Sequence, residues 1–533
     1  MDRSYDAIVI GSGIGGLGAA SLLAQVAGRR VLVLERHFKL GGFTHSFRRG
    51  RFSWDVGLHY VGEMNEGSPG RRLFDLACGG AVAWERMPSP YDVFEYPGLT
   101  FEVPDGEEAY ASALGDAFPR ERTGIAAFFR DLSRASGWFN RFAAAQLLPP
   151  PLSAVAPLPG RSLALTPTAE VLARRFQDPR LRAVAASQWG DYGLPPSQSA
   201  FAIHALIARH YLRGAYYPCG GAGVIAPALA SAIEAVGGAC RVNHAVLGIL
   251  VEAGRAVGVL VRAREGGAER TVEYRAPLVI SDAGALATYG VLLPPGVRRS
   301  PSRKPAPTLG ASAVTLYLGL REDPGALGFR GENRWIFERD DHEATFAARN
   351  DLARGQAGMA YLSFPSLKDP LCRAHTAEIV APIDAEVFSA WRGAAWKRRG
   401  EAYESLKRTI GEGLLELVER RHPGFRDLVE YAELSTPLSI EHFTSHARGG
   451  LYGVPATPAR FSDRALRART PVPGLLLAGA DACSLGIMGA FMGGTLAAAT
   501  ALGPSGFPRI LAAARRGPAS AAMVDRRAAK GAR

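Results

Sequence analysis

Three glycines and one carboxylate near the N-terminus have types and a spacing that suit a particular binding task. Gly11, Gly13 and Gly16 lie in the run GSGIGG, and Glu35 follows about 20 residues later. Gly11 allows a tight turn, Gly13 lets the backbone approach a pyrophosphate, and Gly16 lets a helix pack closely on a strand. The Glu35 carboxylate can accept hydrogen bonds from ribose hydroxyls. These residues therefore predict a dinucleotide site.

The elements around these residues have the order that such a site needs. Residues 7–10 form an apolar, β-branched run that predicts a buried strand, 17–26 predict a helix, and 31–34 predict a second strand that ends at Glu35. The helix N-terminus offers free N–H groups and the positive end of the helix dipole. A glycine-rich turn without a ligand is the alternative. Glu35 disfavours a 2′-phosphate, and therefore NADP.

A second informative stretch lies near the C-terminus. Residues 475–478 predict a short buried strand, followed by Gly479, Asp481 and a run from 482 to 502 without a charged residue. That run is long enough to cross a bilayer, and GAFMG within it has the spacing of paired membrane helices. However, Asp481 directly precedes it, and it is rich in Gly and Ala. We therefore expect a buried helix beside the cofactor, with a transmembrane span as the alternative.

Further motifs link the chain to a known family. They are GG at 41–42, FSWDVG at 52–57, GLHYVG at 57–62, YPCGG at 217–221 and VISDAG at 279–284. With the N-terminal fingerprint, they resemble the FAD-dependent superfamily of phytoene desaturases, carotenoid isomerases and retinol saturases. The His-Tyr pair of GLHYVG is most similar to the retinol saturase branch, that of the all-trans-retinol 13,14-reductase-like proteins.

The resemblance implies an α/β fold: a discontinuous Rossmann-like FAD-binding domain of the flavin amine oxidase and phytoene desaturase type, with an α+β substrate domain. We expect the first domain to comprise 1–75, 215–300 and 455–512, and the second 76–214 and 301–454. Asp481 is expected near the pyrophosphate and ribityl chain, Val246 near the adenine, and the N–H groups of 486–489 near the flavin ring. The implied cofactor-binding residues are Gly11, Gly13, Gly15, Gly16, Glu35, Arg36, Gly41, Gly42, Val246, Gly479, Asp481, Ile487, Met488 and Gly489.

The resemblance also implies a reaction. The expected substrate is a long apolar polyene, such as a retinoid, a carotenoid or a related lipid, and hydride moves between flavin N5 and a substrate carbon. Saturation also needs a proton, for which His59 and Tyr60 are the best candidates and Tyr216 and Tyr217 weaker ones. If the segment is extended, only one of His59 and Tyr60 can point into a given pocket.

Other functions stay open. The same family contains carotenoid desaturases and cis–trans isomerases, and the direction depends on an electron donor or acceptor that the sequence does not identify. A flavin amine oxidase shares the dinucleotide motif, and Cys483 lies near the region where such a flavin can be covalently held. A non-catalytic prenyl-lipid carrier would use the same fold without flavin, which the intact glycine and acid set argues against.

The cysteines and the net charge indicate the compartment in which the protein works and the kind of surface that it binds. The five cysteines are scattered, without metal-ligand spacing, so we predict no metal site and a reducing, cytoplasmic location; Asp6 interrupts any signal-peptide pattern. The net charge is +12, and residues 513–533, a predicted disordered tail, hold six basic side chains and one acid. A second basic cluster is Arg48, Arg49 and Arg51. No nucleic-acid-binding motif accompanies this charge.

A peripheral membrane surface is the expected partner for the basic residues. Residues 126–148 predict a helix whose Phe128, Leu132, Ala135, Phe139 and Phe142 share one face, while Arg130, Arg134 and Arg141 share another. Such a helix could rest on a membrane, although an apolar stripe is more often part of a core.

Overall fold

A five-stranded parallel sheet lies at the centre of the dinucleotide-binding half. The computed structural model describes residues 5–149, 151–297 and 312–517. The strand order is β10-β2-β1-β14-β20, and all neighbouring pairs are parallel. Their apolar runs are largely buried, as expected for a parallel sheet covered on both faces. The strands are β1 (Ala7–Ile10), β2 (Val31–Leu34), β10 (Ala239–Arg241), β14 (Val279–Ser281) and β20 (Leu475–Leu477).

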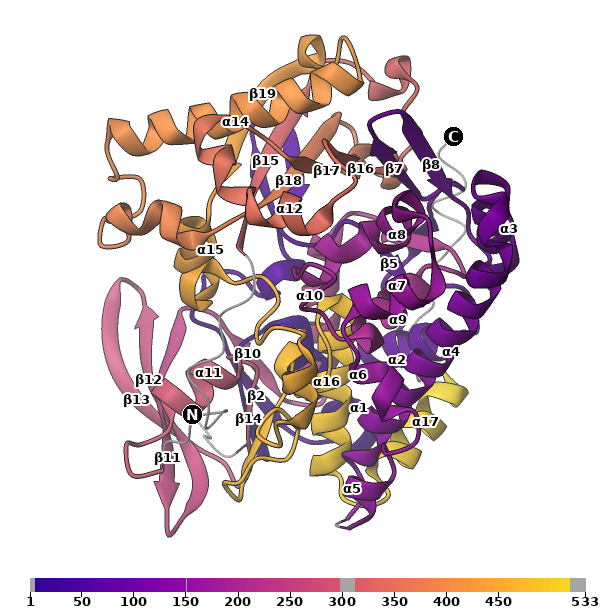
Figure 1. Ribbon diagram of the computed structural model, residues 1–533. Helices are drawn as coiled ribbons and strands as arrows, with labels where there is room; N and C mark the ends of the chain where they lie inside the picture. Colours follow the sequence, from indigo (N-terminus) through magenta and orange to yellow (C-terminus); the bar gives the residue numbers. More distant parts are fainter. Residues whose placement is uncertain (1–4, 150, 298–311, 518–533) are drawn as a thin grey trace, which may run out of the picture.

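Helices α1 (Ile14–Ala27) and α16 (Gly486–Ala501) pack closely beside this sheet (Figure 1). A Cβ atom on Gly494 would overlap the carbonyl oxygen of Gly15, and one on Gly493 would overlap that of Gly479. The small residues of 482–502 therefore serve close packing inside the fold. Within the described residues, no single helix is long and apolar enough to cross a membrane. The bent pair of α16 and α17 (Gly506–Arg516), with 120° between them, has that length and composition when taken together.

Two sequence-based assignments were wrong. The runs at 240–242, 246–251 and 257–261 predict strands of one small sheet, but β10 joins the parallel sheet, where Cys240 pairs with Val33. The small antiparallel sheet instead comprises β11 (His244–Glu252), β12 (Arg255–Glu265) and β13 (Ala268–Arg275). The predicted tail also began too early, because α17 continues to Arg516 and buries Ala513 and Ala514. Residues 518–533 lie outside the described residues.

A seven-stranded mixed sheet forms the upper part of the molecule in Figure 1, in the order β19-β15-β18-β17-β16-β7-β8. Helix α14 (Glu401–Arg421) covers one of its faces, and Leu414 and Val418 of that helix are fully buried in the shared core. The strands are β7 (Asp92–Tyr96), β8 (Leu99–Val103), β15 (Ser312–Leu320), β16 (Asn333–Phe337), β17 (Met359–Ser363), β18 (Thr376–Ile383) and β19 (Val429–Ser435).

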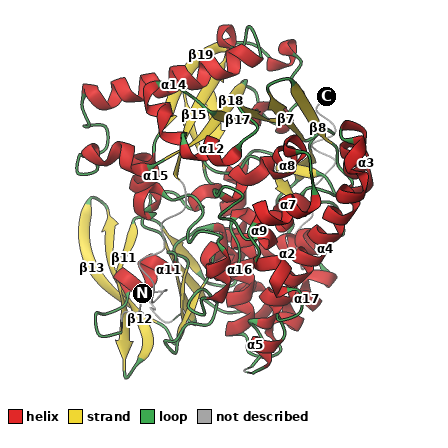
Figure 2. Ribbon diagram, in the orientation of Figure 1, coloured by secondary structure: helices red, strands yellow, loops and turns green. Residues whose placement is uncertain are grey.

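Helices fill the right side of the molecule in Figure 2. They include α2 (Pro69–Cys78), α3 (Glu107–Ala117), α4 (Arg122–Ala145), α7 (Thr168–Arg175), α8 (Pro179–Ala186) and α9 (Phe201–His210). The apolar stripe of α4 is buried: Phe128 packs against Phe176, with ring centroids 5.3 Å apart. The stripe therefore belongs to the core, which is the interpretation that the sequence favoured over contact with a membrane.

Short elements connect these layers. Strands β3 (Ser46–Arg49) and β4 (Phe52–Asp55) form a hairpin, and β9 (Ala215–Pro218) lies between β5 (Val61–Gly62) and β6 (Trp84–Arg86). The hairpin ends near β9: Asp55 accepts hydrogen bonds from the Tyr217 hydroxyl and, at 2.8 Å, from the Ala222 N–H group. The FSWDVG and YPCGG motifs are thus joined by a hydrogen bond.

Candidate active site

The two glycine clusters of the N-terminal region meet in the structure. The N–H group of Gly41 donates to the carbonyl oxygen of Ser12 at 3.2 Å and to its hydroxyl at 3.1 Å. A Cβ atom on Gly42 would lie 3.2 Å from the Cα atom of Gly13. Gly41 and Gly42 have φ angles of 116° and 55°, in the region that favours glycine. Glycines thus line both sides of the turn before α1, where the two backbone segments approach each other closely.

Glu35 ends β2 beside this loop and is buried. Its Oε2 accepts hydrogen bonds from the Ser12 N–H group at 2.9 Å and the Ser12 hydroxyl at 2.7 Å, and its Oε1 accepts one from the His37 N–H group at 2.8 Å. The carbonyl of Glu35 accepts a bond from His244 at 2.7 Å, which places Val246 two residues further along β11. The exposed Arg36 donates to the carbonyl of His442 at 3.1 Å.

Gly479 and Asp481 lie on the other side of the glycine loop. A Cβ atom on Gly15 would overlap the backbone of Gly479. The Asp481 carboxylate accepts hydrogen bonds from the Ala285 N–H group at 2.7 Å and from the Val454 N–H group at 2.8 Å. Asp481 therefore joins three segments: the end of β14, the loop at 451–454 and the turn before α16.

The first turn of α16 differs from the rest of that helix. Ile487, Met488 and Gly489 are partly exposed, whereas most residues from Phe491 to Ala499 are buried. A Cβ atom on Gly489 would meet the Ser484 carbonyl oxygen at 2.5 Å. Substitution at Gly489 thus strains the turn before the helix.

Asp282 is a buried acid that sequence reasoning left without a role. It follows β14, and Cβ atoms on Gly13 and Gly15 would lie 2.6 and 2.7 Å from its two carboxylate oxygens. Burial raises the pKa of Asp282 to about 7, and the nearby carboxylates of Glu35 and Asp481 act in the same direction. The carboxyl group therefore changes charge near neutral pH, directly at the glycine loop.

These residues fit a dinucleotide cofactor. The glycine cradle leaves backbone accessible at the α1 N-terminus, the Glu35 carboxylate suits a ribose, and the first turn of α16 offers partly exposed N–H groups. The hydroxyl of Ser484, just before that turn, is buried without a hydrogen-bond partner. It is a donor for which a bound ligand would provide an acceptor.

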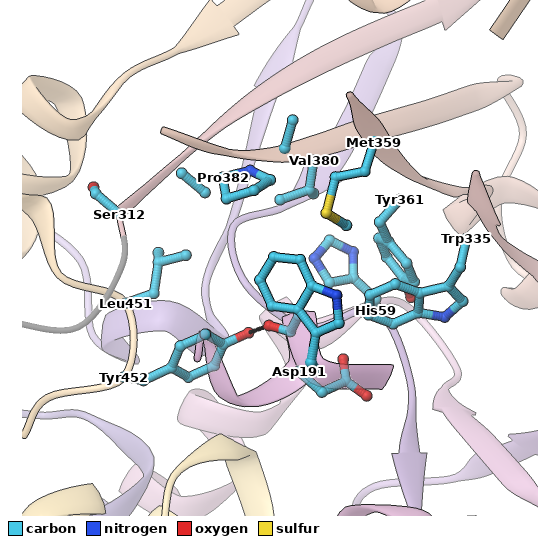
Figure 3. Close-up of a pocket in the computed structure, with 15 residues that line it drawn as sticks. His59, Asp191, Ser312, Trp335, Met359, Tyr361, Val380, Pro382, Leu451 and Tyr452 are labelled. Carbon is cyan, nitrogen blue, oxygen red and sulfur yellow. Dashed lines mark hydrogen bonds between the residues drawn. The ribbon is translucent and has the colours of Figure 1, made fainter. Parts of the chain in front are cut away.

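A cavity lies beneath the seven-stranded sheet, next to this region (Figure 3). Its free volume is about 70 Å³, which is smaller than that of a typical small-molecule site, and it is partly open to solvent. Its walls are mostly apolar and aromatic, with Trp189, Trp335, Met359, Tyr361, Val380 and Tyr452 among them. Tyr452 lines the cavity and Val454 binds Asp481, so a single short loop connects the cavity with the dinucleotide site.

His59 and Tyr60 have different positions, although they are neighbours. His59 lines the cavity, and its Nδ1 lies 2.9 Å from Oε2 of the fully buried Glu378. This contact lacks the angle of a hydrogen bond, and it is an ion pair only when the imidazole is protonated. Tyr60 is not among the cavity-lining residues; its hydroxyl lies 3.1 Å from Asp92 Oδ2 and 3.0 Å from Asp191 Oδ2. Only one of the pair points into the cavity.

A buried lysine lies beside these groups. The Nζ of Lys368 donates to the His59 carbonyl at 3.0 Å, to the Ser363 hydroxyl at 2.7 Å and to the side-chain oxygen of Asn333. Burial lowers the pKa of Lys368 to about 7, against the opposing influence of Glu378 and Asp92. The amine of Lys368 is therefore protonated less readily than that of an exposed lysine, although several carboxyl groups surround it.

The weaker candidates lie away from the cavity lining. The hydroxyl of Tyr217 is bound to Asp55, and Tyr216 pairs with Val61 in the β5–β9 ladder. Burial raises the pKa of the Cys483 thiol to about 12, which keeps it protonated and a poor nucleophile. Nothing in this environment favours covalent attachment of a flavin at Cys483.

Comparison with known proteins places this geometry in a family. Residues 9–76 match the model of the NAD(P)-binding Rossmann-like domain. All-trans-retinol 13,14-reductase of Rattus norvegicus is 33% identical over 530 residues, which cover 94% of this chain and 86% of the rat protein. The chain belongs to the all-trans-retinol 13,14-reductase family. The predicted superfamily is thereby confirmed, as is the predicted class of oxidoreductase acting on carbon–carbon bonds.

Two further proteins match this member of the reductase family at lower identity. Prolycopene isomerase 1 of the Oncidium hybrid cultivar is 28% identical, over 85% of this chain and 75% of that protein. Cyclohexylamine oxidase from Brevibacterium oxydans superposes with a TM-score of 0.59 at 18% identity, covering 96% of this chain and 99% of that one. This likeness confirms the predicted fold class of the flavin amine oxidase type.

Proposed function

We propose that this chain binds FAD and saturates one carbon–carbon double bond of a long apolar polyene, such as a retinoid or carotenoid. The observation that carries the proposal is the apolar, aromatic cavity joined to the dinucleotide site through the loop at 451–454. Membership in the retinol reductase family supports the polyene and the direction. The electron donor stays unidentified.

The chain's own residues have three tasks in this reaction. The glycine loops, Glu35, Asp481 and the first turn of α16 hold the cofactor, which when bound supplies a hydride. The aromatic walls exclude water and orient the polyene. His59 and its buried partner Glu378 place a polar group at the cavity wall, within reach of a substrate.

The test begins with the purified protein. We expect a yellow protein that releases FAD, identified by chromatography after denaturation. The dithionite-reduced protein is then mixed anaerobically with a panel of retinoids and carotenoids, and the products are analysed by mass spectrometry. A gain of two hydrogens supports the proposal. An unchanged mass with altered retention identifies an isomerase, a loss of two hydrogens under oxidising conditions identifies a desaturase, and a flavin-free protein that retains the lipid identifies a carrier.

We further propose that the protein associates peripherally with a membrane surface. Four of its exposed large apolar side chains lie close together in sequence: Leu148, Leu152, Val155 and Leu158, each between 42% and 57% exposed. They flank or belong to the short helix α5 (Leu152–Val155). Leu158 also lines a depression with Arg161, Arg464 and Arg467. Exposed apolar side chains beside basic ones suit an anionic lipid surface, from which an apolar substrate would come.

A further inference from the structure

The hydroxyl of Tyr60 lies between two carboxyl groups. Its oxygen is 3.0 Å from Asp191 Oδ2 and 3.1 Å from Asp92 Oδ2. A phenol has one hydrogen and can donate it to only one of these two acceptors. The other short contact is a hydrogen bond only if that carboxyl group carries its own proton and donates it to the phenol oxygen. The geometry therefore calls for one protonated carboxyl group at this site.

The surroundings decide which carboxyl group carries the proton. Asp92 accepts hydrogen bonds from the side-chain amides of Gln188 at 2.9 Å and Asn333 at 3.0 Å, which stabilise its ionised form. For the Asp191 side chain, the described residues supply Tyr60 alone. Burial raises the pKa of both acids, that of Asp92 to about 6, and the charge of Asp92 raises the pKa of Asp191 further. The proton therefore resides on Asp191.

Asp191 lines the substrate cavity, unlike Tyr60 and Asp92. Its segment is tightly held: Tyr452 donates a hydrogen bond to the carbonyl of Gly190 at 2.9 Å, drawn as a dashed line in Figure 3. A Cβ atom on Gly190 would lie 2.6 Å from the Trp335 ring, and one on Gly193 would lie 2.7 Å from the Tyr452 ring. The segment is thus wedged between two aromatic walls of the cavity, which fixes the position of Asp191.

We infer that Asp191 is the catalytic acid, donating the proton that accompanies the hydride in double-bond saturation. The inference rests on the function proposed above. A bound reduced cofactor would supply the hydride, with its electron pair, for one alkene carbon. The other alkene carbon forms a C–H bond with the Asp191 proton. The Asp191 O–H bond breaks, its electron pair stays on the carboxylate, and solvent restores the proton after the product leaves.

Tyr60 and Asp92 have a positioning role in this step. Before proton transfer, Tyr60 accepts from Asp191 and donates to Asp92. As charge develops on Asp191, the Tyr60 hydrogen can rotate towards it, while Gln188 and Asn333 continue to stabilise Asp92. The array thus provides a donor for the new carboxylate without moving a heavy atom, which is the kind of preorganisation that lowers a barrier.

The decisive experiment compares Asp191→Asn with wild type in anaerobic stopped-flow oxidation of the reduced protein by a polyene that the wild type saturates. General acids contribute about 10²–10⁴-fold, so we expect a loss of that size with unchanged flavin content and polyene binding. Asp191→Glu should restore part of the rate. The control is Asp351→Asn, which should react like wild type. It removes a partly exposed carboxylate whose ion-pair partner among the described residues is the exposed Arg354.

A second readout does not depend on turnover. The infrared difference spectrum of wild type minus Asp191→Asn at neutral pH should contain the C=O stretch of one protonated carboxylic acid, and Tyr60→Phe should shift that band. Absence of the band from the difference spectrum, or an Asp191→Asn rate within twofold of wild type, would overturn the inference. A large loss in His59→Asn alone would assign the acid to His59. A wild type that reacts with no polyene contradicts the proposed function, while the infrared band still decides whether Asp191 is protonated.

Discussion

The carboxylate of Glu35 is the residue that tests the nucleotide site most directly. Its three hydrogen bonds, two from Ser12 and one from His37, hold it at the end of β2 beside the glycine loop. We predict that Glu35→Ala purifies with much less FAD while staying folded. Hydrogen bonds to a charged group contribute about 1.5–3 kcal/mol, so the affinity for FAD should fall by roughly 10- to 100-fold. Flavin absorbance per protein and titration with FAD measure this.

Ser12→Ala is the matched control for Glu35→Ala. It removes the hydroxyl that donates to Glu35 but keeps the carboxylate and the Ser12 N–H bond. We expect it to retain most of its FAD. If both variants lose the flavin equally, the effect comes from loop order rather than from recognition of the ribose, and the role assigned to Glu35 is wrong.

Asp282 predicts a pH dependence of cofactor binding. Its carboxyl group faces the glycine loop, and its pKa is raised by burial to about 7. The neutral form tolerates a nearby diphosphate, whereas the ionised form repels it. FAD affinity should therefore fall as pH rises through about 7, by up to about tenfold per pH unit for one linked proton.

Asp282→Asn should flatten this dependence, because an amide stays neutral over the whole range. The same sign applies to stability. A folded-state pKa above the unfolded value means that the folded protein binds more protons, so the contribution of Asp282 to stability declines from about pH 4 to pH 7 and is constant above. Equal slopes of FAD affinity against pH in wild type and Asp282→Asn would contradict the prediction.

At the residue scale, the sequence predicted contacts between residues of one short stretch, but it did not predict contacts between distant segments. The glycine clusters and Glu35 lie within one short stretch, and the structure brings them together as their spacing predicts. Asp191, Tyr60 and Asp92 belong to three separate segments, and no periodicity in the sequence links them. In the sequence, only the flanking Gly190 and Gly193 indicate that Asp191 lies in a tightly packed segment. The need for glycine at these positions comes from the rings of Trp335 and Tyr452, which are distant in sequence.

At the element scale, the contact between α1 and α16 should be sensitive to a single methyl group. A Cβ atom on Gly494 would overlap the backbone oxygen of Gly15, and a helix backbone cannot give way cheaply. Overpacking costs typically about 1–3 kcal/mol. We predict that Gly494→Ala lowers the free energy of unfolding by about that amount and also lowers flavin content, as measured by denaturant titration and absorbance.

Gly411→Ala provides the matched control on another helix. In α14 the new Cβ atom would lie 3.6 Å from Leu316, an ordinary contact. Alanine is about 1 kcal/mol more favourable than glycine inside a helix, so this variant should be as stable as wild type or more stable. If both variants behave alike, close helix approach is not what requires the glycines of 482–502.

Elements were predictable where one local pattern decides them. The strands at 7–10 and 31–34 follow from apolar runs, and the structure contains both with these same ends. The helix predicted over 126–148 from helical spacing is present but spans Arg122–Ala145. The sheet to which β10 belongs was not predictable, because its three residues carry no signal that distinguishes pairing with β2 from pairing with β11. The sequence likewise did not show which elements cover the apolar stripe of α4. In the structure, the stripe packs against α9 and Phe176.

At the scale of the whole molecule, the cavity exists only because distant segments converge. The N-terminal domain contributes His59, the helical layer Asp191, the seven-stranded sheet Tyr361 and Val380, and the C-terminal part Tyr452. Of these segments, the loop at 451–454 alone also binds Asp481 of the dinucleotide site. A change in the packing of either half should therefore affect both the cavity and the cofactor, which makes flavin content a sensitive measure of correct assembly.

The final prediction concerns the residues through which the protein binds a lipid surface. Apolar insertion is insensitive to salt, whereas attraction of basic residues to anionic lipid weakens as salt rises. We predict that Leu152→Ser with Val155→Ser reduces pelleting with anionic liposomes at both low and high salt, while deletion of 518–533, which carry four basic residues and one acid, reduces it at low salt only. Flavin content should be unchanged in both.

The control is Leu371→Ser, because Leu371 is 65% exposed but lies far from α5 in the sequence. If Leu371→Ser weakens pelleting as much as the α5 variant, general surface hydrophobicity is responsible, and the α5 region is not the docking site.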